Sequence, residues 1–304
     1  MRIGNFADDT APQGTFGISD GQRVLFGEAL LKAAARVGAE AFCADLASFL
    51  NGGTEARAAA AQLLEEARDD ARALADVRPT APYVPGAKIL CQAVNYHAHG
   101  QEAKLAPPEQ PYLFVKVGSS VIGDGDPIPM PSVTRQLDFE VELAAVIGRA
   151  GRDIDEENAL DHVAGYTILN DVSARDVQFN DEKTGITHRF GQNWTHGKGM
   201  DGFGPLGPWI VLSDELSSGY PLQVECRVNG EVRQSAATTD QIFQVPRLVA
   251  FASRGTTLHP GDIISTGTPA GVGMGDGRFL GVGDEIVCTI EKVGSLRNTV
   301  ASLG

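Results

Sequence analysis

Two glutamates separated by one residue, Glu140 and Glu142, are side chains whose spacing suggests chemistry. They lie in residues 137–148, an apolar stretch that lacks proline, ends in glycine and is typical of a β-strand. Side chains alternate along a strand, so both glutamates and Asp138 share one face, with successive acids roughly 7 Å apart. Burying these carboxylates unpaired is costly, and a divalent cation bound to their oxygens removes that cost. The alternative is a strand end that reaches solvent, where the acids are simply hydrated.

A third carboxylate, Asp171, follows a second buried-looking strand at residues 165–169. Functional sites are often built where strands end, although a lone aspartate there also serves as a turn former or helix cap. Together with Glu140 and Glu142, Asp171 would complete a site made only of carboxylate oxygens. Such a site favours magnesium, manganese or calcium over zinc.

A histidine and a glutamate with helical spacing, His99 and Glu102, suggest a general base. Positions i and i+3 of a helix lie on one face, and a carboxylate beside an imidazole orients the ring and raises its basicity. His97 is the weaker candidate because Gly100 stands three residues after it. The alternative is a polar surface turn that happens to contain two histidines.

Lys198 is the remaining candidate from the residues alone, because glycines on both sides allow the backbone to approach a ligand closely. The alternative is a solvated surface charge. The glycine-rich residues 271–277 have the wrong spacing for a dinucleotide loop, and the sequence contains neither a P-loop nor a G-x-S-x-G motif.

The elements that must position these residues divide at a stretch rich in proline, residues 78–86. We therefore expect a small α+β domain over residues 1–80 and a mainly β domain over residues 81–304. In the first, strands at 1–7, 14–19 and 22–26 precede helices at 29–37 and 54–75, the latter capped by Thr54. In the second, strands are expected at residues 88–94, 112–117, 137–148, 165–169, 209–212, 222–228, 231–234, 262–266 and 285–290. Helices are expected at 156–163, with Asp155 as cap, and at 244–252.

Composition restricts the classes of partner. The 304 residues carry a formal net charge of −14, which disfavours nucleic acid and anionic membrane but allows a small anionic substrate beside a local cation. The four cysteines form no C-x-x-C pair, so neither a zinc site nor a disulfide framework is expected. No secretory signal and no membrane-spanning stretch is apparent, and we expect a cytoplasmic protein.

Beyond these single motifs, the order and spacing of seven segments resemble the fumarylacetoacetate hydrolase family. The segments are residues 91–99, 111–116, 137–148, 165–176, 197–199, 205–209 and 260–273. The resemblance covers roughly residues 88 to 304 and implies a mixed β-sandwich roll, mainly β, preceded by the small α+β domain. It also implies that Glu140, Glu142 and Asp171 bind Mg²⁺ or Mn²⁺, with Ca²⁺ as a further option.

Other site residues are also carried over by this resemblance. It implies a catalytic His99–Glu102 dyad on a short helical lid, an active-site Lys198, and substrate contacts from Arg175, Gln178 and Thr268. Two departures are visible: a fourth metal-site aspartate of the animal enzymes cannot be placed, and the loop between Asp171 and Lys198 is longer than in the smallest members.

The function implied by the resemblance is metal-assisted hydrolysis of a C–C bond in a β-diketo acid of the acylpyruvate or fumarylpyruvate type, by a homodimer. Oxaloacetate decarboxylation uses the same groups and stays an alternative, as does isomerisation or dehydration of a 2-oxo acid. A metal-stabilised binding module without turnover is disfavoured, because a His–Glu pair and a lysine accompany the metal set.

Overall fold

A computed structural model of the chain describes residues 1–179, 192–216 and 221–302. The N-terminal part begins with an antiparallel meander of β1 (Arg2–Asp8), β2 (Ala11–Ser19) and β3 (Arg23–Phe26), confirming the strands expected there. Helix α1 (Gly27–Val37) follows and ends at Gly38, whose φ of 70° places it in the left-handed conformation that glycine adopts without strain.

The helix expected at residues 54–75 differs from the prediction at both ends. After the short α2 (Glu40–Cys43), helix α3 (Leu46–Glu66) begins at Asp45, whose carboxylate accepts a hydrogen bond from the Ser48 amide, and it is kinked at Gly53. It ends at Glu66 rather than Ala75. The apolar period continues past Glu66, but β4 (Arg72–Ala73) pairs with β3 instead, so tertiary pairing overrides the helical pattern.

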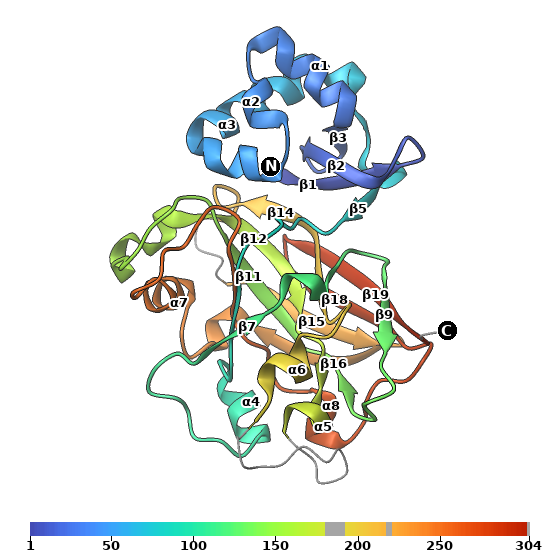
Figure 1. The fold of residues 1–304 in the computed structure, drawn as a ribbon, viewed down its shortest axis with the longest axis vertical. Helices are drawn as coiled ribbons and strands as arrows, with labels where there is room; N and C mark the ends of the chain where they lie inside the picture. The colour runs from blue at the N-terminus through green and yellow to red at the C-terminus, as the bar shows by residue number, and fades with distance from the viewer. Residues whose placement is uncertain (180–191, 217–220, 303–304) are drawn as a thin grey trace.

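One large sheet runs through most of the molecule (Figure 1). Its order is β4-β3-β2-β1-β14-β12-β11-β17-β6-β7, with β5 beside β1 and β8 beside β14. The strands not yet given are β5 (Arg78–Thr80), β6 (Ile89–Gln92), β7 (Leu113–Lys116), β8 (Val121–Ile122), β11 (Val141–Ile147), β12 (Val163–Asn170), β14 (Gly204–Leu212) and β17 (Ile263–Ser265). The N-terminal meander therefore continues the central sheet through the β1–β14 pair, and the domain division at residue 80 stays a prediction.

A second sheet packs against the first. Its order is β16 (Glu231–Ala237), β15 (Gln223–Val228), β18 (Glu285–Ile290), β19 (Gly294–Ser302) and β9 (Pro127–Met130). Asn229 and Gly230, at φ 50° and 80°, form the hairpin turn expected from the sequence. Leu143 and Tyr166 from the first sheet and Val224 and Leu296 from the second share one buried hydrophobic cluster. The predicted β-sandwich roll is thus confirmed, although β9 and β19 were not predicted.

Short helices complete the fold. They are α4 (His97–Glu102), α5 (Arg175–Gln178), α6 (Trp194–Lys198), α7 (Val245–Ala252), α8 (Gly273–Asp276) and the 3-10 turns η1 (Arg68–Asp70), η2 (Leu74–Asp76), η3 (Gly118–Ser120), η4 (Glu156–His162) and η7 (Thr238–Asp240). The segment η4 was expected as an α-helix capped by Asp155, but it is a 3-10 helix with no side-chain cap. Figure 1 shows α1, α2 and α3 at one end of the molecule and α4, α5, α6 and α8 at the other.

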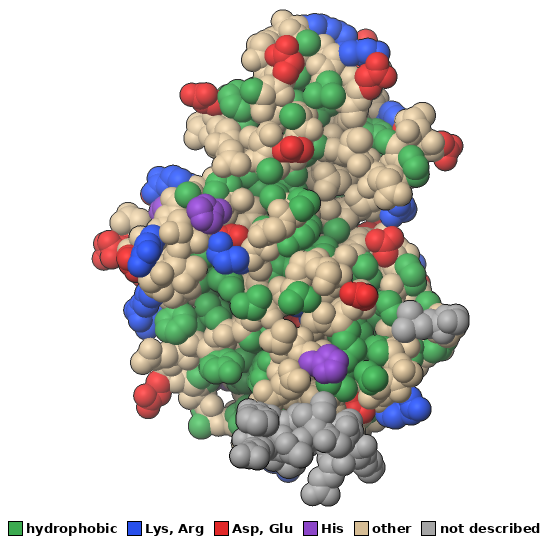
Figure 2. Space-filling model, viewed as in Figure 1, with side chains coloured by type: hydrophobic (Ala, Val, Ile, Leu, Met, Phe, Trp, Pro, Cys, Tyr) green, Lys and Arg blue, Asp and Glu red, His purple; other side chains and the backbone are tan. Residues whose placement is uncertain are grey.

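The surface in Figure 2 mixes charged side chains of both signs around the outline, with hydrophobic side chains between them. The excess of acidic residues therefore does not form one continuous acidic patch on this face. Among the described residues, no helix is long and apolar enough to cross a membrane.

Close packing between β12 and β14 generates a stability prediction. A Cβ atom on Gly165 would lie 2.2 Å from the Val211 carbonyl oxygen and 2.8 Å from Ile210 Cγ2, so the strands must separate to accommodate it. We expect Gly165→Ala to lower the free energy of unfolding in urea by about 1–3 kcal/mol. Gly281→Ala is the control, since its nearest neighbour would be an Asp284 oxygen at 3.8 Å; equal losses in both variants would contradict this explanation.

Candidate metal centre

The strand expected at residues 137–148 is interrupted at Phe139 and Glu140, between β10 (Leu137–Asp138) and β11. Strand register then brings two acids together. Val141 lies opposite Asn170 in the β11–β12 pair, so Glu140 and Asp171 face each other one residue beyond, where the Asp171 amide donates to the Glu140 carbonyl at 2.9 Å. Glu142 lies in β11, two residues after Glu140, and its side chain is therefore on the same side of the strand.

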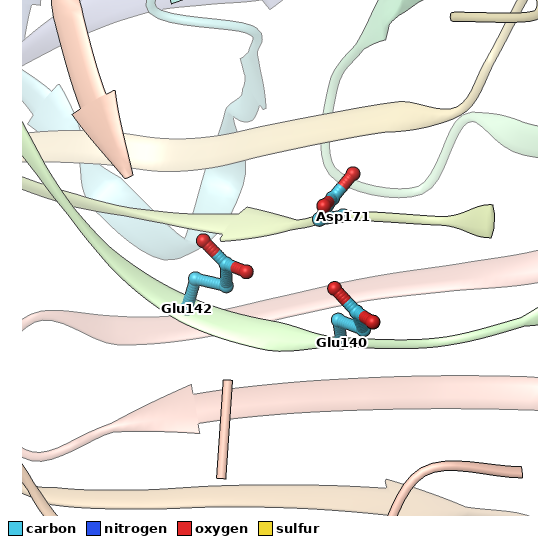
Figure 3. A group of neighbouring side chains, drawn as sticks. All are labelled: Glu140, Glu142 and Asp171. Atoms are coloured by element: carbon cyan, nitrogen blue, oxygen red, sulfur yellow. The ribbon is translucent and has the colours of Figure 1, made fainter. Parts of the chain in front are cut away.

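Three carboxylates converge at this point (Figure 3). One oxygen each of Glu140, Glu142 and Asp171 lies within 4.8 Å of the others, and the residues are 5 %, 1 % and 0 % exposed. The alternative of a hydrated strand end is therefore wrong for these acids, which are buried. Among the described residues no further acid, histidine or cysteine joins this group, so the fourth aspartate remains unplaced.

Two buried lysines compensate part of the negative charge. Lys198 Nζ lies 3.0 Å from Glu140 Oε2, 2.6 Å from Asp171 Oδ2 and 2.7 Å from Ser173 Oγ, so acceptors occupy all three of its N–H donors. Lys116 Nζ lies 2.6 Å from Asp171 Oδ1 and also donates to the Lys198 carbonyl. Sequence analysis missed Lys116, and the available signal was a lysine within the otherwise apolar strand β7.

Arg175 joins the metal-site acids to a fourth buried carboxylate. Its Nε donates to Asp138 Oδ2 at 2.9 Å, and its Nη2 donates to Glu140 Oε1. Its Nη1 donates to Gln178 Oε1 at 3.3 Å. Arg175 was predicted as a substrate contact, and the structure places its guanidinium firmly on protein carboxylates while it also lines the cavity described below.

Charge balance in this cluster is incomplete. Four buried carboxylates (Asp138, Glu140, Glu142 and Asp171) face three cations (Lys116, Arg175 and Lys198), which leaves one negative charge. Burial alone would raise the pKa of Glu140, but Arg175 and Lys198 outweigh it and lower that pKa to about 2. Burial raises the pKa of Glu142 well above its usual range, and the carboxylates of Asp171 and Glu140 add to the effect.

Glu142 therefore identifies where a cation would fit. Its Oε2 accepts from Ser265 Oγ at 2.5 Å and from the Gly267 amide at 3.0 Å, and no lysine or arginine among the described residues forms an ion pair with it. A proton or a divalent cation beside Glu140 and Asp171 would satisfy it. Oxygen ligands of this kind suit hard divalent ions.

The predicted His–Glu pair also lies at this site. His99 Nδ1 is 3.2 Å from Glu102 Oε2, and helix α4, which carries both, covers residues 97–102. The Gly271 amide donates to Glu102 Oε1 at 3.1 Å, and Gly275 packs so tightly that an added Cβ would lie 2.1 Å from the same oxygen. Glu102 is thus held by its histidine on one side and by the residues before α8 on the other.

Asp138 holds the first two residues of α8. The amides of Gly273 and Met274 donate to the two oxygens of Asp138 at 2.6 and 2.9 Å, while Asp138 also holds Arg175. A continuous series of contacts therefore runs from His99 through Glu102, residues 271–274, Asp138 and Arg175 to Glu140. Sequence analysis placed Asp138 on the correct face but assigned it no role.

A cavity of about 570 Å³ joins these groups. Its lining includes His99, Glu102, Glu140, Glu142, Arg175, Gln178, Lys198 and Thr268, so the predicted site residues other than Asp171 all reach it, and Asp171 lies against Lys198. Every lining residue falls between positions 92 and 275, outside the N-terminal part. Much of the loop between Asp171 and Lys198, which is longer than in the smallest family members, falls on residues 180–191, which lie outside the described residues.

Two predicted substrate contacts differ in how they are held. Gln178 is 0 % exposed, and its Nε2 has no hydrogen-bond partner among the described residues, which leaves a buried donor at the cavity. Thr268 donates its hydroxyl to the Val141 carbonyl and accepts from Gln234 Nε2 at 2.8 Å. Gln178 is therefore the better placed of the two to donate to a ligand.

Comparison with known proteins identifies the family. The family model described as fumarylacetoacetate (FAA) hydrolase C-terminal matches residues 88–301. The chain belongs to the fumarylacetoacetate hydrolase family. A relative named as a mitochondrial oxaloacetate tautomerase, from Xenopus laevis, is 42 % identical over 222 residues, which cover 72 % of this chain and 67 % of that protein.

Several solved structures resemble this chain over nearly its whole length. A maleylpyruvate hydrolase from Sphingobium sp. SYK-6, solved with manganese(II) and pyruvate, is 31 % identical over 99 % of both chains, with a TM-score of 0.76. A 2-hydroxyhepta-2,4-diene-1,7-dioate isomerase from Mycobacterium marinum is 32 % identical, covers 100 % of this chain and 99 % of that one, and gives a TM-score of 0.71. Family membership and the buried acid group support a divalent-metal-dependent enzyme that acts on small acids.

The raised pKa of Glu142 predicts that metal binding depends on pH. The folded protein keeps the Glu142 proton to higher pH than the unfolded chain does, so this group lowers the free energy of unfolding of the metal-free protein as pH rises above the ordinary value of 4.5. A divalent cation displaces that proton. We expect Mn²⁺ titrations by calorimetry in different buffers to show proton release, and affinity to rise with pH.

Glu142→Gln tests the same residue directly. We expect it to raise the melting temperature of the metal-free protein at neutral pH, because the folded chain no longer has to hold a proton at this position, and to weaken Mn²⁺ binding by more than about 10-fold. Glu157→Gln, at an exposed position, is the control and should change neither quantity. Unchanged Mn²⁺ affinity in Glu142→Gln would rule out this glutamate as a ligand.

The contacts of Asp138 generate a third prediction with a closely matched control. Asp262 is also buried and also accepts from two backbone amides, of Lys88 and His259, and from the Lys88 ammonium. Unlike Asp138, which holds the Arg175 side chain that donates to Glu140, Asp262 has partners that do not line the cavity. We expect Asp138→Asn and Asp262→Asn each to lower the free energy of unfolding by up to about 3 kcal/mol. Only Asp138→Asn should also weaken Mn²⁺ binding, about 10-fold; equal Mn²⁺ affinity in the two variants would contradict the role given to Asp138.

Proposed function

We propose that this chain is a divalent-metal-dependent hydrolase that cleaves a C–C bond in a β-diketo acid of the acylpyruvate or fumarylpyruvate type. The observation that carries the proposal is that the His99–Glu102 pair lines the same cavity as the buried acids Glu140 and Glu142. A base and a cation site that open into one cavity can act on one small molecule from two sides.

Glu140, Glu142 and Asp171 would hold the metal, which we propose to be Mg²⁺ or Mn²⁺, with Ca²⁺ as a further option. When bound, such an ion acts as a Lewis acid toward the oxygens of a 2-oxo acid. The Gln178 amide, whose buried Nε2 has no partner in the part of the chain that the structure describes, would orient the substrate by hydrogen bonding to its carboxylate.

His99 would act as the general base. Glu102 fixes the ring through Nδ1, which leaves Nε2 to take a proton from water. The water oxygen attacks the carbonyl carbon distal to the pyruvate end, and the bond from that carbon to the methylene breaks. The methylene carbon keeps the electron pair and takes up a proton, so the products are a carboxylic acid and pyruvate.

An ammonium group such as that of Lys198 could stabilise negative charge on the attacked carbonyl oxygen. In this structure its three donors are occupied by Glu140, Asp171 and Ser173, so its direct effect is on the carboxylates. We propose that binding of a cation to those carboxylates would weaken their hold on Lys198 and make a donor available to substrate. The role at the carbonyl oxygen stays a prediction.

A second candidate is interconversion of the keto and enol forms of oxaloacetate. The relative that is 42 % identical to this chain is named an oxaloacetate tautomerase, and His99 could move a proton at the carbon beside the 2-oxo group without any attacking water. Decarboxylation of oxaloacetate and isomerisation of a related 2-oxo acid use the same arrangement. The predictions of a homodimer and of a cytoplasmic location are independent of this choice.

Product analysis distinguishes these reactions. The purified chain would be incubated with Mn²⁺, Mg²⁺ or a chelator against acetylpyruvate and against oxaloacetate, with products followed by NMR. Acetate plus pyruvate supports hydrolysis, exchange of the C3 protons with deuterium alone supports tautomerisation, and pyruvate formed from oxaloacetate supports decarboxylation. Turnover that survives the chelator would contradict all of these proposals.

The dyad generates a fourth prediction. We expect His99→Ala to lower kcat by about 10²–10⁴-fold while Mn²⁺ affinity is retained, because the ring acts on protons and not on the metal. His97→Ala is the matched control, since this exposed histidine lies on the same helix two residues away. Near-normal turnover in His99→Ala, or an equal loss in His97→Ala, would remove His99 from the base role.

A further inference from the structure

We infer that the preferred substrate carries an apolar acyl tail, alkyl or aryl, at the end away from the 2-oxo acid. This inference deepens the proposed function and rests on it. Two structural relatives are named for other substrates, a 2-hydroxyhepta-2,4-diene-1,7-dioate and maleylpyruvate. Those molecules carry a second carboxylate at that end, whereas the substrate inferred here carries an apolar group. The inference is carried by the chemistry of the cavity wall beyond the charged groups.

An aromatic wall begins directly beside the charged floor of the cavity. Trp194 contacts three other rings, with centroids 5.9 Å from Tyr112, 5.0 Å from Phe114 and 6.1 Å from Phe179, and all four residues line the cavity. Lys198 Nζ lies 5.2 Å from the centre of the Phe114 ring. A molecule held at the acids would therefore extend over aromatic surface within a few atoms.

Three exposed apolar side chains also contribute to the cavity wall. Leu105, Tyr112 and Met274 are 53 %, 57 % and 48 % exposed, and all three belong to the lining. Such surface gains when an apolar ligand covers it, by about 25 cal/mol for each Å² removed from water. The cavity volume of about 570 Å³ leaves room for a tail beyond a pyruvate-sized head.

Among the described residues, few cations are available to a second carboxylate. Of the lysines and arginines that line the cavity in this part of the chain, Arg175 and Lys198 are already bound to buried acids, and Lys104 is exposed to solvent. Glu102 also lines this region and would repel a tail carboxylate. A dioate would thus exchange hydration for one solvated lysine, whereas an apolar tail would cover aromatic surface.

The test uses 2-oxo acids that lack the scissile bond, so it does not depend on turnover. Pyruvate, 2-oxohexanoate, 2-oxooctanoate and 2-oxoadipate would be titrated into the full chain with saturating Mn²⁺, by calorimetry and by tryptophan fluorescence in a Trp209→Phe background, which leaves Trp194 as the reporter. We expect affinity to rise up to about fourfold per methylene along the straight chains. Tighter binding of 2-oxoadipate than of 2-oxohexanoate, or no dependence on chain length, would overturn the inference.

Variants locate the effect. Leu105→Ala should reduce the ratio of 2-oxooctanoate to pyruvate affinity several-fold, whereas Val282→Ala, at a residue 59 % exposed and outside the cavity lining, should leave that ratio unchanged. An unchanged ratio in Leu105→Ala would remove that residue from the tail site. The two proposals can fail separately. If affinity rises with chain length as expected but acylpyruvates are not turned over, the proposed hydrolase function is rejected and the apolar subsite is retained.

Discussion

Charge compensation among buried carboxylates is the constraint on which the rest of this structure depends. Asp138, Glu140, Glu142 and Asp171 are each at most 5 % exposed, and carboxylates at that depth persist as anions only when cations and hydrogen-bond donors surround them. Strand β7 and helices α5 and α6 deliver the three cations, Lys116, Arg175 and Lys198, from distant parts of the chain. Three cations for four acids leaves the site one positive charge short, which gives it affinity for a metal ion and a stability cost without one.

The second constraint is that one short segment serves two functional groups. Residues 271–274 hold Glu102 through one amide and Asp138 through two others. Movement of this segment would therefore disturb the base and the arginine beside the acids together. A Cβ added at Gly275 would lie 2.1 Å from Glu102 Oε1, so glycine at this position leaves room for the Glu102 carboxylate. The contacts between the histidine pair and the carboxylate group therefore pass through the backbone of residues 271–274 and then through Asp138 and the Arg175 side chain.

Much of the site could be predicted from sequence because its members follow local rules. Alternation along a strand predicted that Glu140 and Glu142 share a face, helical spacing predicted contact between His99 and Glu102, and a strand end marked Asp171. A lysine in an apolar strand marked Lys116 as unusual, but its partner Asp171 and the role of Asp138 could not be predicted, since each depends on which residues meet in the folded chain. Similarly, α3 ended early because β4 joined the sheet edge, and β19 was missed because its alternating small and polar residues give a weak apolar signal.

The junction of β1 with β14 bears on how such a chain could have been assembled in evolution. The family match begins at residue 88, yet the preceding residues supply the backbone partner of a strand in the interior of the sheet. The Arg2–Val211 and Ile3–Ile210 pairs occupy amide and carbonyl groups of β14 that would otherwise face outward. A catalytic unit inherited without this segment would expose a strand edge prone to pairing with other chains, so an exchange of N-terminal parts between relatives requires a replacement that covers the same edge.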